Sequence, residues 1–190
     1  EIDNKFSKIN MQMDLEYLIP FYYDISIIIP KAEKIQLKNN FNNIGLIFDG
    51  MISGLVNFKG AGSDMLISGD LIIDDSIISL SPDKKIVNQN SRAIVSAELK
   101  MTTGKNVKAI LPNLDFPIIS ATIVENQKLA ISYNAHNKNY QVNGNMKILG
   151  GEIFYFQRSF FITSGLLKMN ESHLYTFDPN ISLEAKLRDF

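Results

Sequence analysis

Apolar and polar residues alternate with a period of two along most of this chain. Val142, Gly144, Met146 and Ile148 share one side of such a stretch, and residues 181–188 repeat the pattern. This alternation is typical of β-strands with one apolar and one solvated face. No stretch shows helical three- and four-residue spacing over a window of about 11 residues. The sequence therefore predicts an all-β protein of about 14 to 16 strands with no significant helix.

Turn residues divide these stretches. Asp74-Asp75 and Glu125–Gln127 predict turns, and Ser81–Ser91 predicts a loop. The pair Gly150-Gly151 falls where the alternation breaks and predicts a bulge or a tight turn. Strands are expected over 9–19, 21–29, 35–37, 44–48, 52–58, 67–73, 77–80, 93–101, 107–111, 119–123, 129–135, 142–148, 163–169 and 181–187.

One strand type recurs, with the form apolar-x-Gly-x-apolar-x-apolar. It occurs over 52–58, 67–73 and 142–148, and in a weaker form over 163–169. The glycine falls on the apolar face each time, where a missing side chain lets a strand bend or lets another group approach closely.

Length, composition and charge favour a single folded domain that does not bind nucleic acid. The chain has 190 residues, of which 45% are hydrophobic, a net charge of −1 and no cysteine. A length of this order suits a single domain, expected over residues 1–190, and the balanced charge gives no basic surface for nucleic acid. The chain begins with glutamate, without methionine or a signal peptide, and is interpreted as a segment of a longer protein.

The apolar faces have two possible fates. They can pack against each other in a closed sandwich or barrel, or a single curled sheet can line an open trough with them. The alternation alone does not decide between these two arrangements, and the closed core is the preferred interpretation of the residues by themselves.

Several motifs in the second half carry a family resemblance. Tyr155-Phe156-Gln157-Arg158-Ser159-Phe160, the following Gly165, and Phe177-Asp178-Pro179-Asn180-Ile181 leading to Ala185 resemble the C-terminal region of TamB-like proteins. These are inner-membrane subunits of the translocation and assembly module, in the AsmA-like superfamily. Residues 99–109 and 68–74 are similar to strand units of the same region, and the likeness covers most of 50–190.

The resemblance implies a long curved sheet folded into an open apolar groove, called a β-taco, in the periplasm. It implies an inner-membrane anchor outside this chain and an Omp85-type outer-membrane barrel partner of the TamA or BamA type. It implies phospholipid transfer between the two membranes and a link to outer-membrane protein assembly. In that setting the groove shields acyl chains, and each exposed methylene would otherwise cost about 0.8 kcal/mol. Independently of the resemblance, no enzymatic activity and no cofactor are predicted.

The lipid-binding groove is expected to be lined by residues of the apolar strand faces. Two of them are methionines, whose flexible, polarizable side chains suit a variable ligand. These are Val95, Ala97, Leu99, Met101, Leu129, Ile131, Tyr133, Val142, Met146, Ile148, Ile181, Leu183 and Leu187.

Other chemistry is sparse. His136 and His173 lie far apart without flanking ligands, so no metal site is predicted. Asp74 and Asp75 are adjacent and would face opposite sides of a strand, which does not suit paired acid–base catalysis. The densest aromatic cluster, within 154–161, is expected to pack in the core, with a lipid-facing or partner-facing patch as the alternative.

Two alternative functions remain. One is a structural or adhesive β-solenoid or sandwich with a closed core, such as part of a surface or fibre protein. The other is a carbohydrate-active β-helix enzyme, which the lack of a carboxylate cluster disfavours. Unpaired edge strands also predict an edge-to-edge homodimer of the isolated segment.

Overall fold

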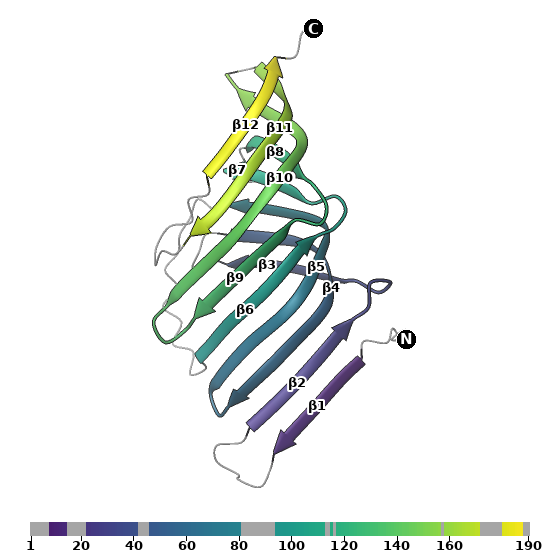
Figure 1. The fold of residues 1–190 in the computed structure, drawn as a ribbon, viewed down its shortest axis with the longest axis vertical. Helices are drawn as coiled ribbons and strands as arrows, with labels where there is room; N and C mark the ends of the chain where they lie inside the picture. Colours follow the sequence, from purple (N-terminus) through teal and green to yellow (C-terminus); the bar gives the residue numbers. More distant parts are fainter. Residues whose placement is uncertain are drawn as a thin grey trace.

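A computed structural model describes residues 8–14, 22–41, 46–80, 94–112, 115, 117–156, 158–171 and 180–187. Over these residues the chain is all-β and contains no helix, as the alternation predicted, so none of them forms a helix able to span a bilayer. The described strands, coloured along the chain in Figure 1, are β1 (Lys8–Asp14), β2 (Tyr22–Ile29), β3 (Ile35–Phe41), β4 (Leu46–Ala61), β5 (Asp64–Leu80), β6 (Ile94–Thr103), β7 (Lys108–Pro112), β8 (Pro117–Ile123), β9 (Lys128–Asn134), β10 (Asn139–Tyr155), β11 (Arg158–Glu171) and β12 (Asn180–Leu187).

All twelve of these strands belong to one hydrogen-bonded sheet. Its main order is β1-β2-β4-β5-β6-β9-β10-β11-β12, with β3 beside β4 and with β7 and β8 between β5 and β10. Neighbours are antiparallel except for β5, which runs parallel to both β6 and β7. The loop predicted over Ser81–Ser91 connects β5 to β6 and lies outside the described residues.

A line of irregular positions crosses the long strands and divides the sheet into two halves. The pairing slips between Asp49 and Met51, between Ile148 and Gly150, and between Ile162 and Ser164. At the same level, residues 104–107 separate β6 from β7, and residues 124–127 separate β8 from β9. We call this line the crease. Figure 1 shows β7 and β8 behind β10 and β11, and β3 behind β9, because the sheet folds over along the crease.

Gly151 shows why glycine is needed at the crease. Its φ of 153° lies in a region that other residues rarely adopt, and a Cβ at this position would collide with the carbonyl oxygen of Ser120 on β8. The predicted bulge at Gly150-Gly151 is therefore confirmed, and the bulge turns β10 from its pairing with β9 to its pairing with β8.

The expected open groove is wrong. Strands β5, β6, β9, β10, β8 and β7 pair in sequence, and β7 returns to β5, so the six form a closed barrel core to which the other strands are added. The circuit closes because β5 and β10 each extend through both halves, pairing with β6 and β9 on one side of the crease and with β7 and β8 on the other.

The barrel encloses the hydrophobic core. Val107 and Ile73 at the crease are almost completely inaccessible to solvent, and they belong to one cluster of buried residues with Phe48, Val142 and Leu167. Side chains from both halves contribute to this cluster, so the apolar faces of the folded sheet cover each other. This burial supplies the main stabilising free energy, at about 25 cal/mol for each Å² of apolar surface removed from water.

Candidate functional site: the apolar interior and the aromatic end

Most residues predicted to line the groove lie on the inner face of the sheet. The register sets Leu99 opposite Ile131 and Met101 opposite Leu129, and Ile131 lies opposite Val142 on the next strand. One row of apolar side chains therefore crosses β6, β9 and β10. The alternation identified this face correctly, although it gave no information about what covers it.

The same residues differ in burial. Leu129, Val142, Met146 and Ile148 are buried in the core cluster. Five others are partly buried and packed against this cluster, namely Met101, Ile131, Tyr133, Ile181 and Leu183. Val95, Ala97 and Leu99 are half-buried. Leu187, near the end of β12, is 47% exposed and lies outside the interior.

Little free space remains between the two halves. The cavity there has a volume of about 40 Å³ and is lined almost entirely by apolar side chains, including Phe48 and Ile78 from one half and Met101 and Met146 from the other. A single water molecule needs about 10–15 Å³ by this measure. The interior of this structure is therefore a packed core without room for a phospholipid acyl chain.

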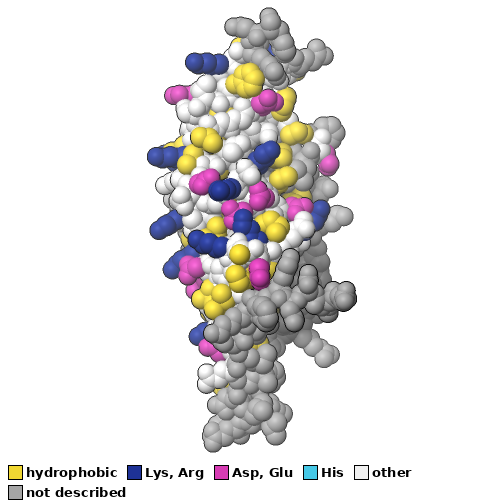
Figure 2. Space-filling model, turned by 90° about the vertical axis from the view of Figure 1, so that its right-hand side faces the viewer, with side chains coloured by type: hydrophobic (Ala, Val, Ile, Leu, Met, Phe, Trp, Pro, Cys, Tyr) yellow, Lys and Arg dark blue, Asp and Glu magenta, His cyan; other side chains and the backbone are white. Residues whose placement is uncertain are grey.

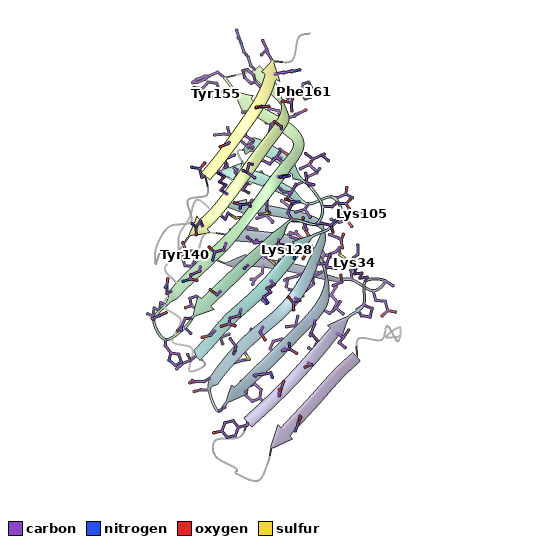
Figure 3. All side chains as sticks on the ribbon, viewed as in Figure 1. Lys34, Lys105, Lys128, Tyr140, Tyr155 and Phe161 are labelled. Atoms are coloured by element: carbon purple, nitrogen blue, oxygen red, sulfur yellow. The ribbon has the colours of Figure 1, made fainter. Side chains whose placement is uncertain are left out.

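Asp74 forms a buried polar cluster on the bend of β5. Its Oδ2 lies 3.1 Å from Nζ of Lys34, and its Oδ1 accepts a hydrogen bond of 2.8 Å from the backbone N–H of Lys105. Figure 3 shows Lys34 and Lys105 close together beside the crease. Burial alone would raise the pKa of Asp74, but the Lys105 N–H and the Lys34 ammonium outweigh it and hold the pKa below its usual value. The carboxylate is thus fully engaged in holding the crease and is not a candidate catalytic base.

A wide hollow of about 600 Å³ lies at the end of the sheet where β2, β4, β5 and β6 meet. Among the side chains that line it, Lys59 Nζ lies 2.8 Å from Asp24 Oδ2, and His136 Nε2 lies 3.9 Å from Asp64 Oδ2. No group of three metal-ligating side chains occurs among the described residues. His136 is exposed in the turn between β9 and β10, and His173 lies outside the described residues.

Large apolar side chains gather at the opposite end of the molecule, around the β10–β11 hairpin. We define this aromatic end as Ile118, Phe154, Tyr155, Phe156, Phe161 and Leu187, each at least 40% exposed. Figure 3 shows Tyr155 and Phe161 at the upper end of the molecule, beside β11 and β12. The preferred prediction, that the aromatic cluster packs in the core, is therefore wrong for four of its residues, while Phe160 is half-buried.

Phe156 is the most exposed of these side chains, at 82%. It occupies the two-residue turn between the paired residues Tyr155 and Arg158, with a φ of 43°. Asparagine or glycine adopts this conformation more readily than phenylalanine does. The Phe156 ring contacts Tyr155 edge-to-face, with ring centroids 4.5 Å apart. A strained, exposed aromatic residue at a hairpin tip is more typical of a contact site than of a folding requirement.

The surface seen in Figure 2 differs from this end. Lysine and arginine side chains are interspersed there with aspartate and glutamate, and apolar side chains are scattered between them. No charge of one sign dominates the described part of that face. The aromatic end is thus the most distinctive exposed surface that the described residues form.

Comparison with known proteins adds no relative: no family model, no curated protein and no solved structure matches this chain. The resemblance to TamB-like proteins therefore stays a prediction, as do the periplasmic location, the inner-membrane anchor and the Omp85-type partner that it implies.

Proposed function

We propose that this chain is a structural β-module of the kind found in surface or fibre proteins, which acts through its exterior. The closed barrel holds the fold, and the exposed aromatic end and the open sheet edges join it to other polypeptides. This corresponds to the alternative function that the alternation of residues left open.

The main observation behind this proposal is that the structure has a filled apolar interior and exposed aromatic side chains on its exterior. The apolar cavity between the two halves has a volume of only about 40 Å³, whereas Tyr155 and Phe156 project into solvent at one end. A protein that carries an apolar ligand in its interior is expected to have a large internal cavity and a polar exterior. Exposed aromatic clusters of this kind mark sites of protein–protein contact, where aromatic residues dominate binding energy.

Native mass spectrometry of the purified protein tests this proposal. The expected spectrum contains only the mass of the polypeptide, or multiples of it, and solvent extraction of the same sample yields no stoichiometric phospholipid. Bound phospholipid at one or more molecules per chain would overturn the structural proposal. The Phe156→Ser variant, which changes only the exterior, serves as a matched control because it leaves every core residue in place.

One observation favours phospholipid transfer as a second candidate function. The interior surface is almost entirely apolar, and its lining includes the adaptable side chains of Met101, Met146 and Met169. Entry of an acyl chain would require the two halves to separate, at the cost of exposing the core. Lipid in the extraction experiment would support this candidate, together with the periplasmic setting and the membrane partners that the sequence resemblance implies.

A further inference from the structure

Strand β12 is a sheet edge with one side of its backbone unoccupied by the described residues. It pairs with β11 through residues 180–187, and no other described strand lies beside it. The hydroxyl of Thr163 on β11 donates a hydrogen bond of 3.2 Å to the carbonyl oxygen of Glu184. Because successive residues of a strand direct their backbone groups to opposite sides, the N–H and C=O of Leu183, Ala185 and Leu187 point away from β11. These groups form a template for another strand.

The sequence of β12 is complementary to itself when it is reversed about Ala185. In an antiparallel pair centred on that residue, Leu183 lies opposite Leu187 of the second copy, and Glu184 lies opposite Lys186. The two-fold axis generates each of these pairs twice. Opposite charges and apolar side chains facing each other across strands both stabilise a sheet. We propose that β12 pairs with β12 of a second copy of this chain, in this register, to form a two-fold symmetric dimer.

The exposure and the contacts of Glu184 and Lys186 agree with this pairing. Glu184 and Lys186 are both exposed. The carboxylate of Glu184 accepts a hydrogen bond of 2.8 Å from Ser164 Oγ, which holds it over the outer face of the sheet and leaves it capacity for a further donor. Lys186 takes part in no ion pair with the described residues. The dimer supplies the missing partner for this ammonium group.

Neighbouring registers are less favourable. An odd shift would place apolar side chains opposite polar ones on the wrong face. Centring the pair on Glu184 or on Lys186 would place two like charges directly opposite each other, which destabilises a sheet. Centring it on Leu183 avoids repulsion but forms no ion pair. Charge complementarity therefore selects Ala185 as the centre.

The partner is a second copy and not an extended head-to-tail array. A symmetric β12 pair uses the same surface on both chains and closes after two, whereas pairing β12 with the other described edges, β1 or β3, would continue into a filament. This inference rests on the proposed function, since it specifies one edge contact of the structural module.

Single-cysteine cross-linking tests the register, because the chain has no cysteine of its own. Directly opposed residues of antiparallel strands have Cα atoms about 4.5–5.5 Å apart, within the range that a disulfide bridges. Ala185→Cys is expected to oxidise to a covalent dimer in high yield. Ser182→Cys is the matched control, because in this register it lies opposite a position six residues further along the strand and not opposite its own copy, so it stays monomeric on a denaturing gel. Preferential cross-linking of Leu183→Cys or Ser182→Cys would overturn the proposed register.

Charge reversal tests the same contact without cross-linking. By sedimentation equilibrium, Glu184→Lys alone and Lys186→Glu alone should each raise the dimer dissociation constant about tenfold or more. The double variant Glu184→Lys/Lys186→Glu should restore it, because the two ion pairs form again with reversed sign. Failure of the double variant to recover, or a wild-type chain that stays monomeric at millimolar concentration, would overturn the dimer.

A proline substitution separates the dimer from the fold. Ala185→Pro removes an N–H that points away from β11, which an edge strand tolerates, so the monomer stays folded while the dimer is lost. Ala185→Thr keeps the N–H and the dimer. If the wild-type chain does not dimerise and its native mass spectrum shows polypeptide without bound lipid, the β12 dimer is wrong and the proposed structural function stands. Bound phospholipid would instead remove the proposed function, whatever the oligomeric state.

Discussion

Lys34 and Asp74 form an ion pair, with 3.1 Å between Nζ and Oδ2, that joins the β2–β3 turn to the bend of β5. The residues lie 40 positions apart in sequence, and the carboxylate is among the most buried charged groups described. The Lys34 side chain is partly exposed, so this is a partly buried pair, and removing one partner leaves the other charge without its compensation.

We expect Asp74→Asn to lower the free energy of unfolding by about 1–3 kcal/mol near neutral pH. The amide oxygen can still accept from the Lys105 N–H, but the charge opposite Lys34 is lost. Denaturant unfolding followed by circular dichroism measures the difference. Asp75→Asn is the matched control, because Asp75 is exposed and asparagine tolerates its positive φ. Equal effects of the two substitutions would contradict a structural role for the buried pair.

The pH dependence of stability follows from the same carboxylate. The pKa of Asp74 is lower in the folded protein than its usual value of 3.8. A lowered pKa contributes stability that is present above the usual value and is lost as the pH falls through the folded pKa. The wild type should therefore lose stability below about pH 4 more steeply than Asp74→Asn. Urea unfolding at a series of pH values measures the free energy of unfolding of both proteins. If that free energy falls equally steeply with decreasing pH in the two, Asp74 does not contribute to the pH dependence of stability.

The two adjacent glycines of the crease should respond differently to alanine. Gly151→Ala combines an unfavourable φ with a collision against the Ser120 carbonyl, and should cost about 1–3 kcal/mol or more. Gly150→Ala is the control, since its Cβ would meet the carbonyl oxygen of Ile162 at an ordinary 3.5 Å. Thermal unfolding measures both. A similar loss at both positions would show that strand flexibility, and not the backbone geometry of Gly151, is what the bulge requires.

The sequence predicted the strands and their faces because both depend on local alternation. Val142 and Met146 were expected on one apolar face, and both lie in the core. Local alternation could not predict whether that apolar face is covered by another part of the sheet. Whether two apolar faces meet depends on the bends and on pairings between distant strands, such as β7 with β5, which leave no local signal.

The polar cluster of the crease and the aromatic end escaped prediction for related reasons. The turn predicted at Asp74-Asp75 is wrong, because both residues lie within the single strand β5, where Asp75 has a φ of 44°. The partner of Asp74, Lys34, is identified only when the β2–β3 turn is placed beside β5. The run Phe154–Phe156 has the composition of a core strand. The pairing of Tyr155 with Arg158 places its last residue at a hairpin tip, in solvent. A two-residue turn centred on an aromatic residue departs from the usual turn composition, so no turn was expected there.

Met146→Asp tests the closed interior directly. Met146 is 2% exposed and contributes to the lining between the two halves, so a carboxylate there would be buried without a partner. We expect loss of about 3 kcal/mol or more of stability, and often of folding altogether. Asn145→Asp, on the neighbouring exposed position, is the control and should change stability by less than about 0.5 kcal/mol. A folded Met146→Asp protein with native stability would mean that water reaches this face.

Phe156→Asn tests whether the aromatic tip serves contact at the expense of the fold. Asparagine suits the positive φ of this position, which relieves strain of about 1 kcal/mol, while the substitution removes the edge-to-face contact with Tyr155, worth about 0.5–1.5 kcal/mol. Because these effects offset each other, the melting temperature should stay within a few degrees of the wild type. Binding of a hydrophobic fluorescent dye should fall, since the most exposed aromatic ring is gone. Ile73→Ala, a buried change, is the contrasting control, with a large loss of stability expected. A marked loss of stability in Phe156→Asn would instead make this ring part of the fold, and the contact surface at this end would then consist of the other exposed residues, chiefly Phe154, Tyr155 and Phe161.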